Sequence, residues 1–127
     1  MKKLNSILLI DDDHASNFLH KMIIQRTNCV EHIKVCISAQ KGLDYLINKD
    51  DPDYQIPDII FLDINMPGMN GLDCISKIRS LNFNLPVILS SGSLRFEDED
   101  LKRYKVSSKI MKPYEFDTML DTIKQLI

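Results

Sequence analysis

The stretch Ile59-Ile60-Phe61-Leu62-Asp63 is a continuous apolar run that ends in a carboxylate. Such a carboxylate, at the mouth of a buried strand, is costly unless it binds a cation or does chemistry there. A tight turn, Asn65-Met66-Pro67-Gly68, follows it, and a second apolar run, Ile7-Leu8-Leu9-Ile10, ends in Asp11 and Asp12. Two strands of this kind can bring three acids together at one edge of a sheet.

The composition indicates a single domain, residues 1–127, of ordinary globular character. Hydrophobic residues make up 44% and charged residues 27%, and the net charge of -2 does not favour direct nucleic-acid binding. No apolar stretch approaches the ~20 residues that span a membrane, and no signal-peptide core follows the start. We therefore expect a cytoplasmic protein without a membrane partner, whose three cysteines are free thiols.

Strand-like apolar runs alternate with helical patterns along the chain. The predicted strands are 4–10, 32–37, 59–62, 87–89 and 108–111, with 32–37 at an edge of the sheet. The predicted helices are one capped by Asp13 that runs to about Thr27, one capped by Ser38, one capped by Asn70, one near 97–104, and one that begins at Pro113. This alternation predicts an α/β fold with a doubly wound, five-stranded parallel sheet and right-handed crossovers.

Each helix is expected to bury one apolar stripe at helical spacing. Asp13 and Ser38 are suited to cap the first two helices. The stripe residues are Ala15, Phe18, Leu19, Met22 and Ile23 in the first helix, Ala39, Leu43, Leu46 and Ile47 in the second, Leu72, Ile75 and Ile78 in the third, and Phe116, Met119, Leu120 and Ile123 in the last.

Polar residues follow four of the predicted strands at their carboxyl ends. In open parallel sheets, ligands bind beyond these ends, near the point where the strand order reverses. The sequence therefore predicts one site that holds Asp11, Asp12, Asp63, Ser91 and Lys112.

Oxygen ligands without histidine or cysteine favour Mg²⁺, or Mn²⁺, over zinc. Asp63 could then attack a phosphoryl group and form an acyl phosphate. The Ser91 hydroxyl, the Lys112 charge and the backbone amides of the turn after Asp63 would stabilise the transferred group. Each residue alone has a plainer interpretation, as a cap, a turn or a solvated strand end. Their joint occurrence in order, at successive strand ends, favours the shared site.

These residues together resemble a known family. Ile7 to Asp12, the Phe61 to Gly71 block, Pro86 to Gly92 and Lys112-Pro113 are similar to the receiver domain of two-component response regulators, of the chemotaxis-regulator type. The resemblance covers nearly the whole chain. It implies a flavodoxin-like fold with strand order 2-1-3-4-5 and five helices on two faces.

The resemblance also implies a role for each matching residue. Asp63 matches the phospho-acceptor, Asp12 a direct metal ligand, and Asp11 an acid that acts through water. Ser91 matches the switch hydroxyl and Lys112 the lysine that contacts the phosphoryl group, with a cis Lys112-Pro113 bond. The Asn65 carbonyl matches the third protein ligand of the metal, and the phosphate-binding positions are Ser91, Gly92, Lys112, Asn65 and Met66.

Two positions depart from the family pattern. Lys109 stands where an aromatic residue usually rotates inward when the switch hydroxyl moves, so the aromatic half of the switch is not expected here. Asn17 stands where several relatives carry an arginine, and the sequence assigns it no role.

As a receiver, the domain would take a phosphoryl group from a histidine kinase or a histidine phosphotransfer protein. It would signal to a downstream protein through the face made by the fourth helix, the fifth strand and the fifth helix, without direct nucleic-acid binding. Two alternatives are a haloacid-dehalogenase-like phosphohydrolase and a receiver that works without phosphorylation. The first normally carries an acid where Asn65 stands, and the intact acids argue against the second.

Overall fold

A computed structural model describes residues 3–63, 71–91, 102–103, 105–106, 108–111 and 115–126. For Ser91, Ser108, Lys109 and Met111 it describes the backbone alone. The strands form one parallel sheet in the order β2-β1-β3-β4-β5, which confirms the predicted topology. The strands are β1 (Leu4–Ile10), β2 (Val30–Cys36), β3 (Ile59–Asp63), β4 (Val87–Ser91) and β5 (Ser108–Met111).

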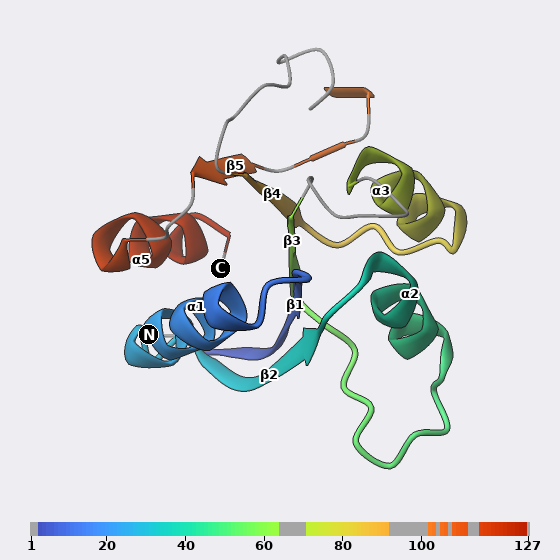
Figure 1. Cartoon of the computed structure of the whole chain (residues 1–127), viewed down its shortest axis with the longest axis horizontal. Helices are drawn as coiled ribbons and strands as arrows, with labels where there is room; N and C mark the ends of the chain where they lie inside the picture. Colours follow the sequence, from blue (N-terminus) through green and yellow to red (C-terminus); the bar gives the residue numbers. More distant parts are fainter. Residues whose placement is uncertain are drawn as a thin grey trace.

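Helices cover both faces of the sheet, as a doubly wound fold requires (Figure 1). The described helices are α1 (His14–Arg26), α2 (Ala39–Ile47), α3 (Gly71–Ser80) and α5 (Phe116–Lys124). Helices α1 and α5 lie on one face and α2 and α3 on the other. The helix expected at 97–104 lies outside the described residues except for Lys102 and Arg103, whose backbone is helical.

The centre of the sheet is β3, in which all five residues are buried. Successive side chains of a strand point to opposite faces. Accordingly Ile60 and Leu62 join the core beneath α2 and α3, whereas Ile59 and Phe61 join the core beneath α1 and α5. A strand covered on both faces explains the continuous apolar run in the sequence.

The first two predicted helix caps are confirmed. The Asp13 carboxylate accepts a hydrogen bond from the Ala15 backbone N–H at 3.0 Å, and the Ser38 hydroxyl oxygen accepts one from the Lys41 N–H at 3.0 Å. Each bond satisfies a backbone donor that the first turn of a helix leaves without an intrahelical acceptor.

Three boundaries differ from the prediction by two or more residues. Strand β2 begins two residues earlier because Val30 pairs with Leu4, and β4 continues to Ser91, which pairs with Met111. The last helix was predicted to begin at Pro113, but α5 begins at Phe116. Glu115 has extended backbone angles (φ -99°, ψ 149°), so helical geometry starts only after it.

The predicted buried stripe of α1 is wrong for Ala15, Phe18 and Leu19, although Ile23 of the same stripe packs against the core. Phe18 is 72% exposed and Leu19 38% exposed, whereas Asn17, His20 and Ile24 are buried. The buried residues are spaced i, i+3 and i+7 and therefore share a face of the helix, roughly opposite to Phe18 and Leu19. Similar corrections apply to Ile47 and Phe116, which are 58% and 41% exposed.

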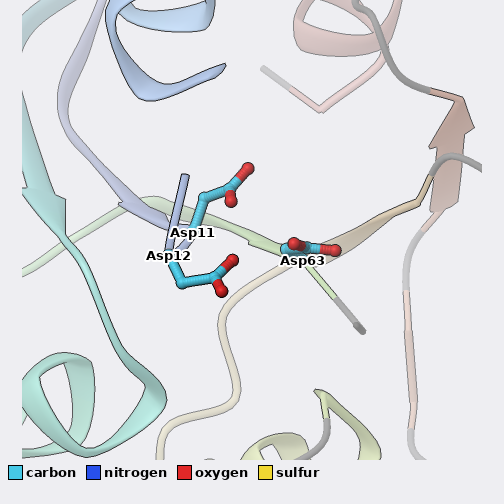
Figure 2. Close-up of side chains that lie close together, drawn as sticks. All are labelled: Asp11, Asp12 and Asp63. Carbon is cyan, nitrogen blue, oxygen red and sulfur yellow. The ribbon is translucent and has the colours of Figure 1, made fainter. Parts of the chain in front are cut away.

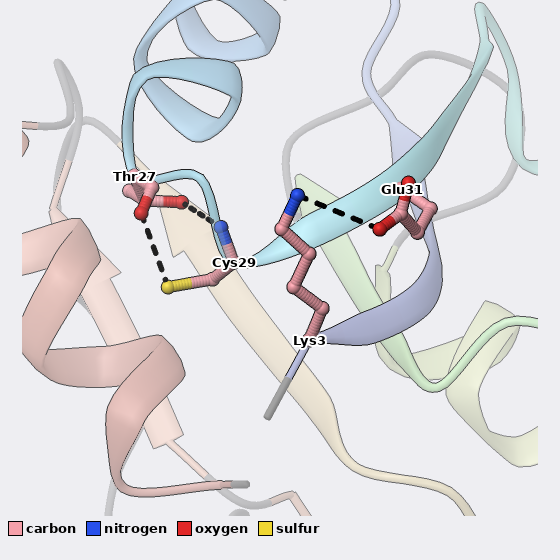
Figure 3. Close-up of polar contacts among 4 residues, drawn as sticks. All are labelled: Lys3, Thr27, Cys29 and Glu31. Carbon is pink, nitrogen blue, oxygen red and sulfur yellow. Dashed lines mark hydrogen bonds and ion pairs between the residues drawn. The ribbon is translucent and has the colours of Figure 1, made fainter. Parts of the chain in front are cut away.

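The three cysteines are free and buried, as expected. At the turn between α1 and β2, the Cys29 thiol donates to the Thr27 carbonyl at 3.3 Å, beside an exposed ion pair between Lys3 and Glu31 at 3.5 Å (Figure 3). Within the described parts of the chain, no helix is long and apolar enough to cross a membrane.

We expect iodoacetamide to modify Cys74 slowly in the native protein at pH 8. The side chain is fully buried, and this burial raises the pKa of the thiol to about 11. The thiolate fraction is then about a hundredfold below that of an ordinary thiol, and the thiolate is the reactive form. Mass spectrometry of the Cys74 peptide over time measures the rate, with urea-unfolded protein as the control. Equal rates in the two states would contradict the buried environment.

Candidate functional site

Three carboxylates gather at the carboxyl edge of the sheet. Oxygen atoms of Asp11, Asp12 and Asp63 lie within 4.8 Å of one another. Figure 2 shows Asp11 and Asp12 at the end of β1 and Asp63 at the end of β3. The register explains this meeting, because Ile10 pairs with Leu62 and the next residue of each chain segment is an acid. The sequence prediction that these three acids meet is confirmed.

The three acids differ in exposure. Asp11 is 1% exposed and Asp63 6% exposed, while Asp12 is open to solvent. Like charges at such short range repel each other most strongly where water is excluded, and a cation removes that repulsion. Their oxygen atoms are the hard ligands that Mg²⁺ and Mn²⁺ prefer, and Mg²⁺ commonly uses one or two carboxylates beside waters. The residues present therefore fit a divalent cation, and the exposed Asp12 leaves it a route from solvent.

Hydrogen bonds fix the loop that carries two of these acids. The Asp11 carboxylate accepts from the Asp13 backbone N–H at 3.0 Å, and Asp13 in turn accepts from the Ser16 hydroxyl at 3.0 Å. The Asn17 side-chain amide donates to the Asp11 carbonyl at 2.8 Å. Asp12 thus stands between two residues that are held by hydrogen bonds, so the backbone that carries its carboxylate is fixed before a cation binds.

This supporting network was not found from the sequence, apart from the role of Asp13 as a cap. The run of three aspartates before a helix was the available signal, since such side chains bond to nearby backbone amides. Asn17 gave no signal, because a polar residue in an amphipathic helix is normally placed on the solvent face.

Other predicted site residues are placed only in part. The backbone of Ser91 ends β4, at the same edge of the sheet as the acids, but its side chain is outside the described atoms. Its neighbour Ser90 is buried, pairs with Asp63 and donates to the Leu62 carbonyl at 3.4 Å. The remaining predicted residues lie outside the described residues: Asn65, Met66, Gly92, Lys112 and Pro113. Lys109 lies in β5, with its backbone alone described.

The acidic cluster thus lies where open, doubly wound parallel sheets bind their ligands, beyond the carboxyl ends of the central strands. The response regulator receiver domain family matches residues 7–124. The chain belongs to this family, whose general function in two-component systems is phosphorylation on an aspartate.

Two named response regulators are similar to this chain over most of its length. The nitrate/nitrite response regulator protein NarL of Escherichia coli is 30% identical over 122 residues, which cover 94% of this chain and 53% of that protein. A probable C4-dicarboxylate response regulator, DctR of Priestia megaterium, is 29% identical over 98% of this chain and 52% of its own length. The chain therefore spans about half the length of these relatives.

Solved structures share the fold over almost the whole chain. A two-component response regulator from Cytophaga hutchinsonii is 31% identical, with a TM-score of 0.82 and 98% coverage of both chains. The response regulator TrrA of Thermotoga maritima, solved in complex with Mg²⁺ and BeF, has a TM-score of 0.80 at 24% identity and covers 97% of this chain and 99% of that one. The second likeness concerns the fold alone.

Proposed function

We propose that Asp63 is the aspartate that accepts the phosphoryl group. The observation that carries this proposal is the meeting of Asp63 with Asp11 and Asp12 within 4.8 Å, at the carboxyl edge of a receiver fold. Asp63 is the last residue of the central strand, and only 6% of its surface is exposed. A carboxylate in this position can serve both as a cation ligand and as a nucleophile.

The cation would be held by Asp12 and Asp63, by the backbone carbonyl of Asn65 and, through water, by Asp11. Mg²⁺ fits this donor set, and Mn²⁺ is possible. When bound, the ion supplies positive charge that neutralises the acids and the incoming phosphoryl oxygens. The phosphate would be bound by Ser91, Gly92, Lys112, Asn65 and Met66.

In the transfer step, an Asp63 oxygen forms a bond to phosphorus in line with the bond to the leaving imidazole nitrogen of a phosphohistidine. As the phosphorus–nitrogen bond breaks, its electron pair stays on the imidazole. The Lys112 ammonium and the Ser91 hydroxyl would meet the charge on the equatorial oxygens. The domain thus supplies catalysis for its own phosphorylation and, with water as the nucleophile, its own dephosphorylation, and is otherwise a signalling module rather than an enzyme.

Receiver domains interact with histidine kinases or phosphotransfer proteins. For this chain, we propose a cytoplasmic location and, as the phosphoryl donor, a histidine kinase or histidine phosphotransfer protein. A downstream protein would bind the face formed by the 97–104 segment, β5 and α5, without direct contact between this domain and nucleic acid. Phosphorylation would bias an existing equilibrium of that face. The haloacid-dehalogenase-like and phosphorylation-independent alternatives are not favoured, since the family matches and the acids meet.

We expect acetyl phosphate to add one phosphoryl group to the wild-type chain only when Mg²⁺ is present. Excess EDTA should stop labelling, because three neighbouring carboxylates repel the donor without the ion. Asp12→Asn should raise the Mg²⁺ concentration needed for half-maximal labelling at least about tenfold, as loss of a metal ligand or its support does. Intact-protein mass spectrometry across a Mg²⁺ series measures this. Asp44→Asn, an exposed change on α2, is the control, and labelling that persists in EDTA would contradict the cation requirement.

A further inference from the structure

The side chain of Asn17 is buried beside the acidic cluster. It projects from the first turns of α1 with 5% of its surface exposed, and its Nδ2–H donates to the Asp11 main-chain carbonyl at 2.8 Å. A carbonyl can only accept, so the nitrogen of the amide must face the Asp11 carbonyl, and the oxygen remains available to a different donor. The orientation of this amide is thereby settled by its neighbour.

The oxygen of the same amide is an unexplained group. Within the described part of the chain, the Asn17 Oδ1 atom is buried and has no hydrogen-bond partner. Buried polar atoms normally have a partner, and leaving one without any costs free energy. A purely structural tie between β1 and α1 explains the Asn17 nitrogen and leaves the oxygen unaccounted for.

The position of Asn17 gives its oxygen a candidate partner. The bond to Asp11 places the amide next to the segment that carries Asp11 and Asp12, whose carboxylates lie within 4.8 Å of Asp63. A Mg²⁺ ion in such a site keeps several waters, and each bound water is a strong donor. Groups behind a metal site that orient its ligands commonly have large effects on metal affinity.

We propose that Asn17 is a positioning residue for the cation at Asp11, Asp12 and Asp63. Its nitrogen holds the Asp11 carbonyl, and thereby the peptide that leads to Asp12, while its oxygen accepts from a water molecule that accompanies the cation. This inference rests on the proposed cation site and adds to it a residue from α1. It also explains why a polar side chain occupies the buried face of this helix in place of Phe18 or Leu19.

Asn17→Leu tests the proposal, because leucine has a similar volume and removes both the donor and the acceptor. We expect the dissociation constant for Mg²⁺ of the unphosphorylated protein to rise about tenfold. Isothermal titration calorimetry with Mg²⁺ alone measures it, so no phosphoryl transfer is involved. Urea unfolding in EDTA reports the stability of the cation-free state separately. If Asn17→Leu does not fold, Asn17→Ser serves in its place, since serine leaves the helix intact and is too short to reach both partners.

Gln25→Leu is the matched control, since it makes the same amide-to-leucine change at an exposed position of α1 outside the loop that carries the acids. Its Mg²⁺ affinity should stay within about twofold of wild type. If Asn17→Leu lowers the stability in EDTA but leaves the Mg²⁺ affinity unchanged, Asn17 serves only to connect β1 and α1. This result would overturn the inference. If the wild-type protein itself binds no Mg²⁺, the proposed cation site is wrong. If the wild type and Asn17→Leu bind Mg²⁺ equally well, the cation site stands and only the role of Asn17 is wrong.

Discussion

Asp63→Asn is expected to abolish the mass gain of one phosphoryl group when the protein is treated with acetyl phosphate and Mg²⁺. Asparagine is nearly the same size as aspartate, so the end of β3 and its pairing with Ser90 should be kept. The neutral amide lacks the anionic oxygen that attacks phosphorus, and the substitution also removes one of the three charges that attract the cation. Labelling should therefore fall below detection by intact-protein mass spectrometry.

The control for this experiment is Asp53→Asn, an exposed acid in the loop that leads into the amino end of β3. It should label as the wild type does, since it lies at the edge of the sheet away from the cluster. Labelling retained in Asp63→Asn would place the acceptor elsewhere and withdraw the role proposed for Asp63. Mg²⁺ titration of the same variant separates the two functions of the carboxylate. We expect Asp63→Asn to bind Mg²⁺ more weakly and to show no labelling. If it shows no labelling but binds Mg²⁺ as tightly as the wild type, Asp63 is the nucleophile without being a metal ligand.

The acidic cluster was predictable because it depends on topology more than on side-chain detail. Once the strands are parallel and 4–10 lies beside 59–63, residues that follow both strands must meet at one edge. The observed pairing of Ile10 with Leu62 then brings Asp11 and Asp63 to neighbouring positions. The same rule also accounts for the position of the Ser91 backbone, which ends β4 beside β3.

The orientation of α1 could not be predicted from its own sequence. Hydrophobic periodicity predicts that the face with Phe18 and Leu19 is buried. In the structure, however, the Asn17 side chain donates a hydrogen bond to the Asp11 carbonyl in the loop after β1. The helix therefore turns a polar residue inward, with Ile24 as its fully buried apolar anchor. The buried face of α1 therefore depends on a contact between the helix and the loop after β1. The hydrophobic pattern of the helix alone carries no information about that contact.

The stability of two phenylalanine variants tests which face of α1 is buried. Phe61 is fully buried in β3 and packs in the core beneath α1 and α5, whereas Phe18 is 72% exposed on α1. Phe61→Ala should lower the free energy of unfolding by about 3–5 kcal/mol, through lost burial and the cavity left behind. This is a large share of the ~5–15 kcal/mol that stabilises a typical domain. Phe18→Ala should change it by no more than about 0.5 kcal/mol, as for most surface substitutions.

Urea unfolding followed by circular dichroism measures both variants against wild type, and each serves as the control for the other because the chemical change is identical. A loss of several kcal/mol in Phe18→Ala would mean that α1 buries its apolar stripe, as its periodicity suggests. Asn17 would then face solvent, and the hydrogen bond to the Asp11 carbonyl could not form. The stability of Phe18→Ala thus bears on the cation site as well as on the core, since both depend on the same rotation of one helix.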